Sequence, residues 1–172
     1  MDLTEIFRIK AVLPFVKGRL LDIGCGYNNL VKKYKGEGVG VDVFNWGERP
    51  DYVVERTDCL PFEDETFDTI TFLACLNHIP YRVSVLKEAR RILKKDGRII
   101  ITMIAPLIGK IAHLIEIKDE LMRGEIHQNE TPGLSLQDLK AIFKEANLII
   151  EKTKSFEFGL NKIYLLKKQF NF

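Results

Sequence analysis

An acid and two glycines stand close together near the start of the chain, in the stretch LLDIGCGYNNL at residues 20–30. Asp22 lies two residues before Gly24, and Gly26 follows after one more residue. The apolar run predicts a buried strand, and the glycines predict a tight turn that leads into a helix. In such a turn, backbone N–H groups can face a ligand at short range because no side chain stands in the way.

The position of the acid distinguishes between two classes of ligand that bind such turns, dinucleotides and S-adenosylmethionine. The dinucleotide fingerprint has a third glycine five residues after the first, where this chain has Asn29. A carboxylate at Asp22 would repel a pyrophosphate, whereas it would attract the ammonium and sulfonium groups of S-adenosylmethionine. The sequence therefore favours S-adenosylmethionine as the ligand.

Two further acids follow the next predicted strands. Asp42 ends a second short strand, and Asp58 opens the stretch DCLPF after a third. Asp42 could hold both ribose hydroxyls in either ligand class, so a NAD-dependent oxidoreductase stays open as a less favoured alternative. Asp58 could accept a hydrogen bond from the exocyclic amine of an adenine. Acids at successive strand ends predict one crevice at the carboxyl edge of a parallel sheet.

The elements that would position these acids alternate between strands and helices. This alternation predicts a parallel sheet covered on both faces. An amphipathic helix is expected before Pro14. The expected strands are 19–23, 37–42, 52–54, 67–73 and 98–103, with helices at 28–34 and at 83–94, the latter ended by Asp96-Gly97.

The rest of the chain has a different pattern. Apolar residues at helical spacing predict a helix over 106–123, followed by a polar loop. Ser135 is expected to cap a helix that runs to about Ala146. Strands at 148–156 and 162–168 predict an antiparallel hairpin near Gly159. No linker is apparent, so residues 1–172 are expected to form one domain: a cofactor-binding half (1–103), a capping helix and loop (104–134), and a C-terminal helix and hairpin (135–172).

Four stretches, in order and at family-like spacing, resemble the class I S-adenosylmethionine-dependent methyltransferases. They are LLDIGCGYNNL, GVGVDVF, DCLPFEDETFDTITFLACLNHI and EARRILKKDGRIIIT, and they cover about 19–102. The chain looks most like the methyltransferase type 11 group, which includes quinone-biosynthesis enzymes. The resemblance implies a single α/β, Rossmann-like domain. Its seven-stranded, mostly parallel sheet would have the order 3-2-1-4-5-7-6, with the last strand antiparallel.

The resemblance also assigns roles to individual residues. Asp22, Gly24, Cys25 and Gly26 would line the methionine end of S-adenosylmethionine, and Asp42 with Val43 would hold the ribose. Asp58, Cys59 and Leu60 would frame the adenine. Ala74 and Cys75, in the loop ACLNHI, would face the methionine part and the methyl group.

The sequence departs from the family pattern at two places. The family often has glycine where Asn28 stands, which predicts a turn that approaches the cofactor less closely. Between Asp42 and the third strand, the stretch VFNWGERPD is too short for the usual crossover helix, since a parallel crossover needs about a dozen residues or more. In this stretch, Phe44 and Trp46 could either stack on the adenine or cover the bare edge of the sheet.

Catalysis is expected to need little from the side chains. Methyl transfer from a sulfonium is a direct displacement, so alignment of the acceptor supplies much of the effect. His78 could be a general base, although a structural role in the loop is favoured. His113 and His127 are candidate acceptor contacts. No third ligand accompanies them, so no metal site is expected.

The charge and hydrophobicity of the sequence argue against some classes of binding partner. The net charge is +2 with basic residues spread along the chain, which argues against nucleic acid. The longest apolar run, 99–109, is shorter than the roughly 20 residues of a membrane span. No secretory signal is apparent, and Cys25, Cys59 and Cys75 form no CxxC pair, so a cytoplasmic protein is expected.

The favoured function is therefore a methyltransferase that acts on a small molecule. The predicted helix over 106–123 could cap an apolar acceptor such as a quinone or a lipid headgroup, although simple packing on the sheet is favoured for most of its residues. A non-catalytic or partner-dependent S-adenosylmethionine-binding module is the main alternative, because the shortened connection after Asp42 could leave the site incomplete. The oligomeric state and the acceptor atom are not encoded in any motif.

Overall fold

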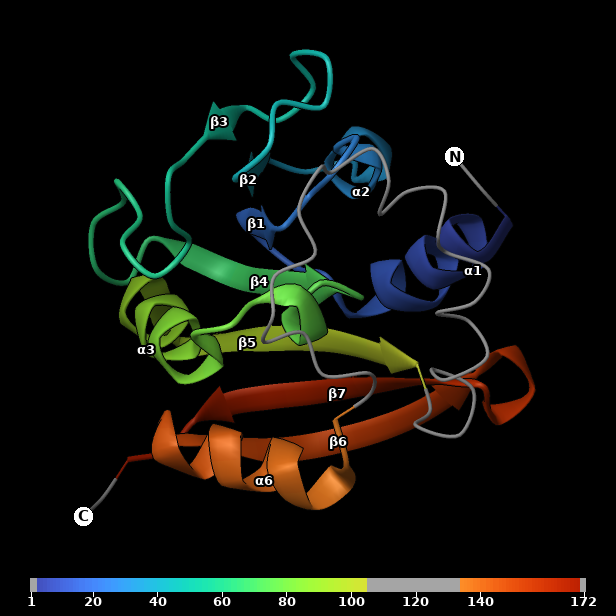
Figure 1. Cartoon of the computed structure of the whole chain (residues 1–172), viewed down its shortest axis with the longest axis vertical. Coiled ribbons are helices and arrows are strands. Elements are labelled where there is room, and N and C mark those ends of the chain that lie inside the picture. The colour runs from blue at the N-terminus through green and yellow to red at the C-terminus, as the bar shows by residue number, and fades with distance from the viewer. Residues whose placement is uncertain (1–2, 105–133, 171–172) are drawn as a thin grey trace.

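The computed structural model describes residues 3–104 and 134–170, which form a seven-stranded sheet with helices on both faces (Figure 1). The strand order is β3-β2-β1-β4-β5-β7-β6, as expected from the resemblance. Strands β1 to β5 run parallel, and β7 is antiparallel to both of its neighbours. Their bounds are β1 Leu20–Ile23, β2 Gly38–Asp42, β3 Tyr52–Val53, β4 Phe67–Leu73, β5 Leu93–Ile104, β6 Leu148–Phe156 and β7 Asn161–Lys168.

Alternate residues of the central strands enter two separate apolar layers. On one face, Leu21, Ile99 and Ile101 pack in the cluster that includes the buried residues of helices α3 (Arg82–Ile92) and α6 (Leu136–Glu145). On the other face, Leu20 and Ile100 pack with helices α1 (Leu3–Val12) and α2 (Asn29–Lys33). Strands buried on both faces explain the continuous apolar runs in the sequence.

The predicted end of the helix at 83–94 is wrong. Helix α3 ends at Ile92, and Leu93 is extended (φ −75°, ψ 137°) and pairs with Phe67 of β4. The N–H groups of Glu65 and Thr66 donate to the carbonyls of Arg91 and Ile92 and so complete the helix end. Gly97 therefore does not stop the helix; it lies in an irregular part of β5, where the register with β4 shifts.

The C-terminal part agrees with the sequence prediction. Ser135 caps α6 in a capping box with Asp138, in which each side chain accepts from the backbone N–H of the other. Strands β6 and β7 form the expected antiparallel pair, joined by the short 3-10 helix η3 (Glu157–Gly159). Another 3-10 helix, η1 (Leu13–Phe15), follows α1 at Pro14.

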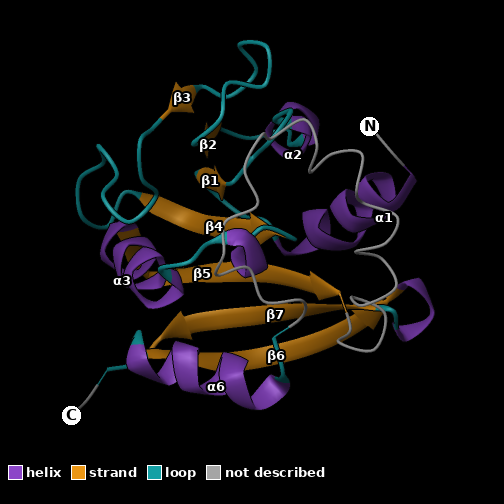
Figure 2. Ribbon diagram, viewed as in Figure 1, coloured by secondary structure: helices purple, strands orange, loops and turns teal. Residues whose placement is uncertain are grey.

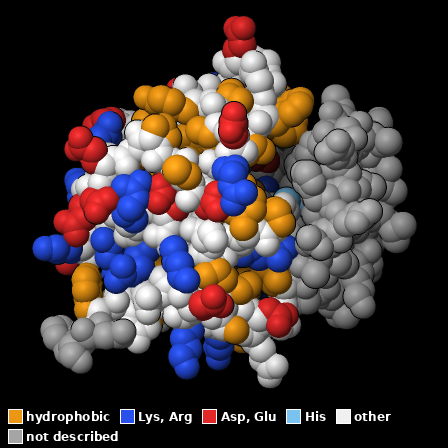
Figure 3. Space-filling view, turned by 60° about the vertical axis from the view of Figure 1, so that its left-hand side comes forward, with side chains coloured by type: hydrophobic (Ala, Val, Ile, Leu, Met, Phe, Trp, Pro, Cys, Tyr) orange, Lys and Arg blue, Asp and Glu red, His pale blue; other side chains and the backbone are white. Residues whose placement is uncertain are grey.

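The connection between β2 and β3 contains no helix, as the sequence predicted, and Figure 2 draws it entirely as a loop. Strand β3 has only two residues, and both Tyr52 and Val53 are exposed. On the face shown in Figure 3, exposed hydrophobic side chains gather below the projecting upper tip, whereas basic and acidic side chains are interspersed elsewhere. None of the helices among the described residues is long and apolar enough to cross a membrane.

Candidate cofactor-binding site

The turn after β1 has a left-handed backbone at every second residue. Gly24, Gly26 and Asn28 have φ values of 71°, 51° and 60°. Among residues with a side chain, asparagine is one of the few that adopt this conformation readily, which explains how Asn28 replaces the glycine common in the family. The Asn28 side chain is only 2% exposed, so its amide is buried within the protein.

Asp22 is buried in β1 directly before this turn, with 2% of its surface exposed. The Thr71 hydroxyl donates to Asp22 Oδ1 at 2.6 Å. Burial raises the pKa of Asp22 to about 7, against the lowering effect of the Thr71 hydrogen bond, and the nearby Asp42 and Glu5 carboxylates add to the increase. A cation bound beside Asp22 would favour its ionised form, so this carboxyl group suits an ammonium-bearing ligand.

Asp42, at the end of β2, is fixed by two backbone donors. The Gly26 N–H donates to Asp42 Oδ2 at 2.8 Å, and the Phe44 N–H donates to Oδ1 at 3.0 Å. Because each carboxylate oxygen has two lone pairs, each retains one that can accept a ribose hydroxyl. Val43, the next residue, is 53% exposed at the same strand end.

The end of β4 meets the same turn. A Cβ atom placed on Gly24 would lie 2.8 Å from Cys75 Sγ, so a glycine is needed for this close approach. The Cys75 thiol donates to the Ile23 carbonyl at 3.1 Å. Ala74 has a left-handed backbone (φ 53°), an unfavourable conformation that often marks a functional position. The structure thus brings together the expected contacts at 22–26, 42–43 and 74–75.

The structure places Asp58 in an unexpected pairing. Its two carboxylate oxygens accept hydrogen bonds from Arg56 at 2.8 and 2.6 Å. The Arg56 guanidinium also lies 4.5 Å from the centre of the Tyr81 ring. The pKa of Asp58 is lowered chiefly by the hydrogen bond from Arg56. An adenine amine would therefore have to share this carboxylate with Arg56.

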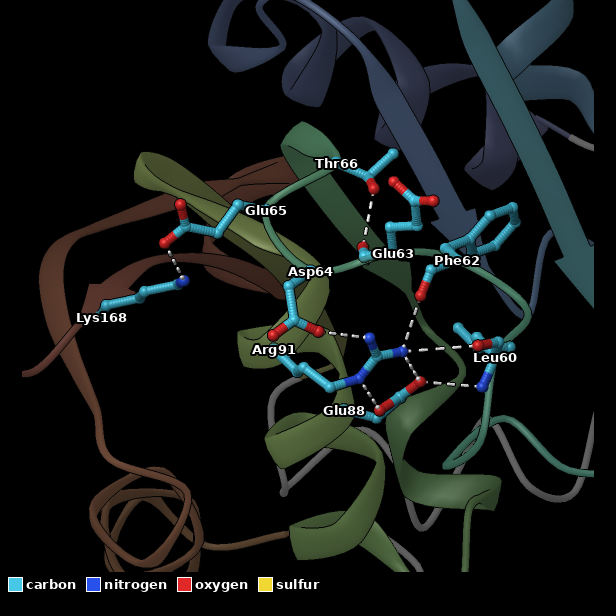
Figure 4. Close-up of polar contacts among 9 residues, drawn as sticks. All are labelled: Leu60, Phe62, Glu63, Asp64, Glu65, Thr66, Glu88, Arg91 and Lys168. Atoms are coloured by element: carbon cyan, nitrogen blue, oxygen red, sulfur yellow. Dashed lines mark hydrogen bonds and ion pairs between the residues drawn. The ribbon is translucent and has the colours of Figure 1, made fainter.

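The rest of the expected adenine loop is held by helix α3 (Figure 4). The Leu60 N–H donates to Glu88 Oε1 at 2.8 Å, and Glu88 also binds Arg91. Arg91 donates in turn to the Phe62 carbonyl and to Asp64. Leu60 is buried, and Cys59 is exposed beside it. These contacts give Arg91 a structural role in the loop.

His78 ends the 3-10 helix η2 (Leu76–His78), which follows the loop at 74–75. Its Nε2 lies 3.0 Å from Asn77 Nδ2. Since an amide nitrogen only donates, Nε2 is the acceptor in this arrangement and the proton of the neutral ring lies on Nδ1. The Arg82 guanidinium donates to the Leu76 and Asn77 carbonyls and fixes this turn.

Several site residues were not found from the sequence. Thr71 was missed as the partner of Asp22, although a polar residue within an apolar strand was a signal for it. The pairing of Arg56 with Asp58 and the contacts of Arg82 were not predicted, because they lie in turns whose geometry the sequence does not specify. His113, His127 and the predicted helix over 106–123 lie outside the described residues. Among the described residues, no group of three or more His, Cys, Asp or Glu could hold a metal.

Trp46 packs against two aromatic neighbours. Its ring centre lies 5.1 Å from those of both Tyr27 and Phe44. The Arg49 guanidinium lies over the Tyr27 ring at 5.3 Å. This packing joins the connection after β2 to the glycine turn, and both interpretations of Phe44 and Trp46, stacking on the adenine and covering the sheet edge, stay open.

Comparison with known proteins supports the geometry. A family model described as a methyltransferase domain matches residues 4–153. An uncharacterised protein of Methanocaldococcus jannaschii is 29% identical, and the match covers 88% of this chain and 75% of that protein. The demethylmenaquinone methyltransferase of Bacillus cytotoxicus is 30% identical over 62% of this chain and 51% of its own length. This chain thus spans about half the length of that relative.

Further matches point to the same fold. The 27-O-demethylrifamycin SV methyltransferase of Amycolatopsis mediterranei is 31% identical, over 82% of this chain and 58% of that enzyme. A Thermotoga maritima structure, described as an S-adenosylmethionine-dependent methyltransferase and possible histamine N-methyltransferase, has a TM-score of 0.70 at 20% identity, with 95% and 89% of the two chains covered. A Haloferax volcanii structure, solved as a complex of a methyltransferase with the Trm112 methyltransferase activator, has a TM-score of 0.72 at 19% identity, with 98% and 90% covered.

Proposed function

Because this chain belongs to the class I S-adenosylmethionine-dependent methyltransferases, we propose that it transfers a methyl group to a small-molecule acceptor by direct in-line displacement. The observation that carries the proposal is the pair of buried acids at the glycine turn, Asp22 and Asp42. S-adenosylmethionine carries an ammonium group and two ribose hydroxyls. The Asp22 carboxylate could pair with the ammonium, and the free lone pairs of the Asp42 carboxylate could accept from the hydroxyls.

The roles of the residues follow from their contacts. When bound, S-adenosylmethionine supplies a methyl group on a sulfonium sulfur, and attack by the acceptor's nucleophile releases S-adenosylhomocysteine. Asp22 would hold the ammonium, Asp42 and Val43 the ribose, and the turn at 24–26 the methionine chain. Ala74 and Cys75 would border the methyl group.

The adenine would lie between Asp58, Cys59 and Leu60. The Asp58 carboxylate can still accept from the adenine amine while it is paired with Arg56, because each oxygen has a second lone pair. Helix α3 keeps this loop in place through Glu88 and Arg91. This side of the site depends on side-chain contacts at the surface.

The acceptor side is proposed from the position of His78 and from the relatives. His78 follows Ala74 and Cys75, and its Nε2 could take the proton that the acceptor loses once the acceptor replaces the Asn77 amide at this nitrogen. The named relatives act on a demethylmenaquinone and on a rifamycin, so an apolar hydroxylated acceptor is our first choice. We further propose that residues 1–172 form one domain, in which 104–134, with His113 and His127, covers the acceptor.

The test is a transfer assay with labelled S-adenosylmethionine and a panel of apolar hydroxylated compounds, chemically reduced demethylmenaquinone (the quinol) among them. Label in the organic extract with one acceptor, lost in Asp42→Ala, supports the proposal. Binding of S-adenosylhomocysteine without transfer to any acceptor would instead support a binding module. Binding of NAD in its place would support the oxidoreductase alternative.

A partner-dependent enzyme is the second candidate, favoured by one observation. Strand β3 is a two-residue edge strand with exposed Tyr52 and Val53, where a crossover helix would otherwise lie. The Haloferax volcanii structural neighbour was solved with an activator protein. If the purified chain transfers methyl groups only after addition of a host-cell protein fraction, this candidate replaces the self-sufficient enzyme.

A further inference from the structure

Asn28 is itself one of the two departures from the family pattern, and its side chain contacts the other, the shortened connection between β2 and β3. Its backbone forms the third left-handed position of the glycine turn. Its Nδ2 donates to the Arg49 carbonyl at 3.1 Å and to Asp51 Oδ2 at 3.0 Å. Both partners belong to the shortened connection between β2 and β3. The amide must lie this way because both of its neighbours at Nδ2 are acceptors. We call these two hydrogen bonds the Asn28 bridge.

The Asn28 bridge continues into strand β2. Asp51 Oδ2 also accepts from the Gly40 N–H at 2.7 Å, and the Asp51 N–H donates to the Gly40 carbonyl at 2.9 Å. A Cβ atom on Gly40 would lie 2.1 Å from Asn28 Oδ1, so only glycine leaves room for the buried amide. Asn28, Gly40 and Asp51 thus form one interlocked unit that joins turn, strand and loop.

Asp42 depends on the two segments that the bridge joins. One of its oxygens is bound by Gly26 of the turn, and the other by Phe44 of the loop. If the turn and the loop moved apart, the carboxylate could keep only one of these donors. A carboxylate fixed at one oxygen can rotate, and its remaining lone pairs would no longer point in fixed directions.

We propose that Asn28 is a positioning residue for the ribose subsite. In place of the absent crossover helix, the Asn28 bridge would hold the connection between β2 and β3 against the glycine turn. The inference rests on the proposed function only in assigning the ribose to Asp42. It predicts that loss of the Asn28 amide reduces affinity specifically for ligands that carry the ribose hydroxyls.

The first test compares two ligands by calorimetric titration: S-adenosylhomocysteine and its analogue without both ribose hydroxyls. The unsubstituted protein should prefer the former by about tenfold or more, as for a charge-assisted hydrogen-bond pair. Asn28→Gly, which keeps the left-handed backbone, should bind S-adenosylhomocysteine about tenfold more weakly and the analogue almost unchanged. Equal losses for both ligands would overturn the proposal, since a merely structural role would affect both.

Two further variants separate the bridge from general damage to the loop. Asn45→Ala removes a contact within the loop, from the Glu48 N–H to Asn45 Oδ1, and leaves the bridge intact, so the ligand preference should be kept. Asp51→Ala should resemble Asn28→Gly. The double variant should be no worse than either single one, because residues in one network are not additive. Additive losses would contradict a shared role.

A second measurement needs no ligand. Amide hydrogen exchange at Gly26 and Phe44 should be at least about fivefold faster in Asn28→Gly, while exchange within β4 stays the same. Unchanged exchange at these two amides would overturn the bridge. If the unsubstituted protein bound S-adenosylhomocysteine and its analogue equally, Asp42 would not bind the ribose and the proposed role of Asn28 in the ribose subsite would be wrong. Hydrogen exchange at Gly26 and Phe44 would still test whether the Asn28 bridge holds the turn and the loop together.

Discussion

The two flanks of the candidate site are built in different ways. On the flank formed by β1 and β2, Asp22 and Asp42 are buried, and Asp42 is held by backbone N–H groups. On the flank beyond β3, Asp58 is held by the side chain of Arg56, which is largely exposed. The backbone donors of Gly26 and Phe44 lose no side-chain entropy when they bind, whereas an exposed ion pair contributes little. The first flank should therefore supply most of the affinity for the cofactor.

The largest effect is expected at Asp42. The change Asp42→Ala removes both ribose contacts and leaves the Gly26 and Phe44 N–H groups without their acceptor. We expect S-adenosylhomocysteine to bind at least tenfold more weakly, about 1.4 kcal/mol or more. Titration calorimetry measures this loss, with circular dichroism to show that the variant is folded. Unchanged affinity in a folded variant would contradict the ribose role.

The next effect is a dependence on pH through Asp22, whose pKa is about 7 without ligand. Only the ionised carboxylate attracts an ammonium, so the affinity for S-adenosylhomocysteine should rise about tenfold between pH 6 and pH 8. In Asp22→Asn the affinity should be weak and nearly constant over this range. An equal pH dependence in both proteins would show that another group is responsible.

The same group affects stability with the opposite sign. The pKa of Asp22 is higher in the folded protein than in the unfolded chain, so the folded state binds the proton more tightly. Its contribution to the free energy of unfolding is complete below about pH 4 and is lost as the pH rises through 7. Without ligand, thermal stability should fall between pH 5 and pH 8 more steeply than in Asp22→Asn. The measurement is calorimetric melting at both pH values.

A smaller effect is expected on the second flank. Arg56→Ala should free the Asp58 carboxylate and change the affinity for S-adenosylhomocysteine by only about threefold, since the Arg56 side chain is 60% exposed. Asp58→Ala should cost slightly more, because it also removes the acceptor of the adenine amine. A loss at Asp58 as large as that at Asp42 would show that the two flanks contribute equally.

The smallest expected effect is a change in the rate at which a cysteine is chemically modified. Cys59 is exposed, whereas Cys25 is buried and burial raises the pKa of both the Cys25 and Cys75 thiols. A thiol reagent should therefore modify Cys59 first, and S-adenosylhomocysteine should slow that reaction severalfold if the adenine lies beside it. Mass spectrometry of digested peptides identifies the labelled residue. An unprotected Cys59 would move the adenine away from this loop.

The first flank could largely be predicted from the sequence, and the second could not. The glycine turn, the acids at 22 and 42 and the strand order depend on local pattern and on the resemblance. The pairing of Asp58 with Arg56 depends on a turn that no pattern specifies. The end of α3 at Ile92 was missed because tertiary contacts from Glu65 and Thr66, and not Gly97, end the helix. The sequence showed Asn28 only as a departure from the family's glycine. Its left-handed backbone and its side-chain hydrogen bonds to Arg49 and Asp51 could be seen only in the structure.

The most direct test of the central claim is calorimetric titration of the purified protein at pH 8 with S-adenosylhomocysteine, with NAD as the control. We expect one molecule of S-adenosylhomocysteine to bind per chain and NAD not to bind, because Asp22 attracts an ammonium and repels a pyrophosphate. Binding of NAD alone, or of neither ligand, would contradict the account.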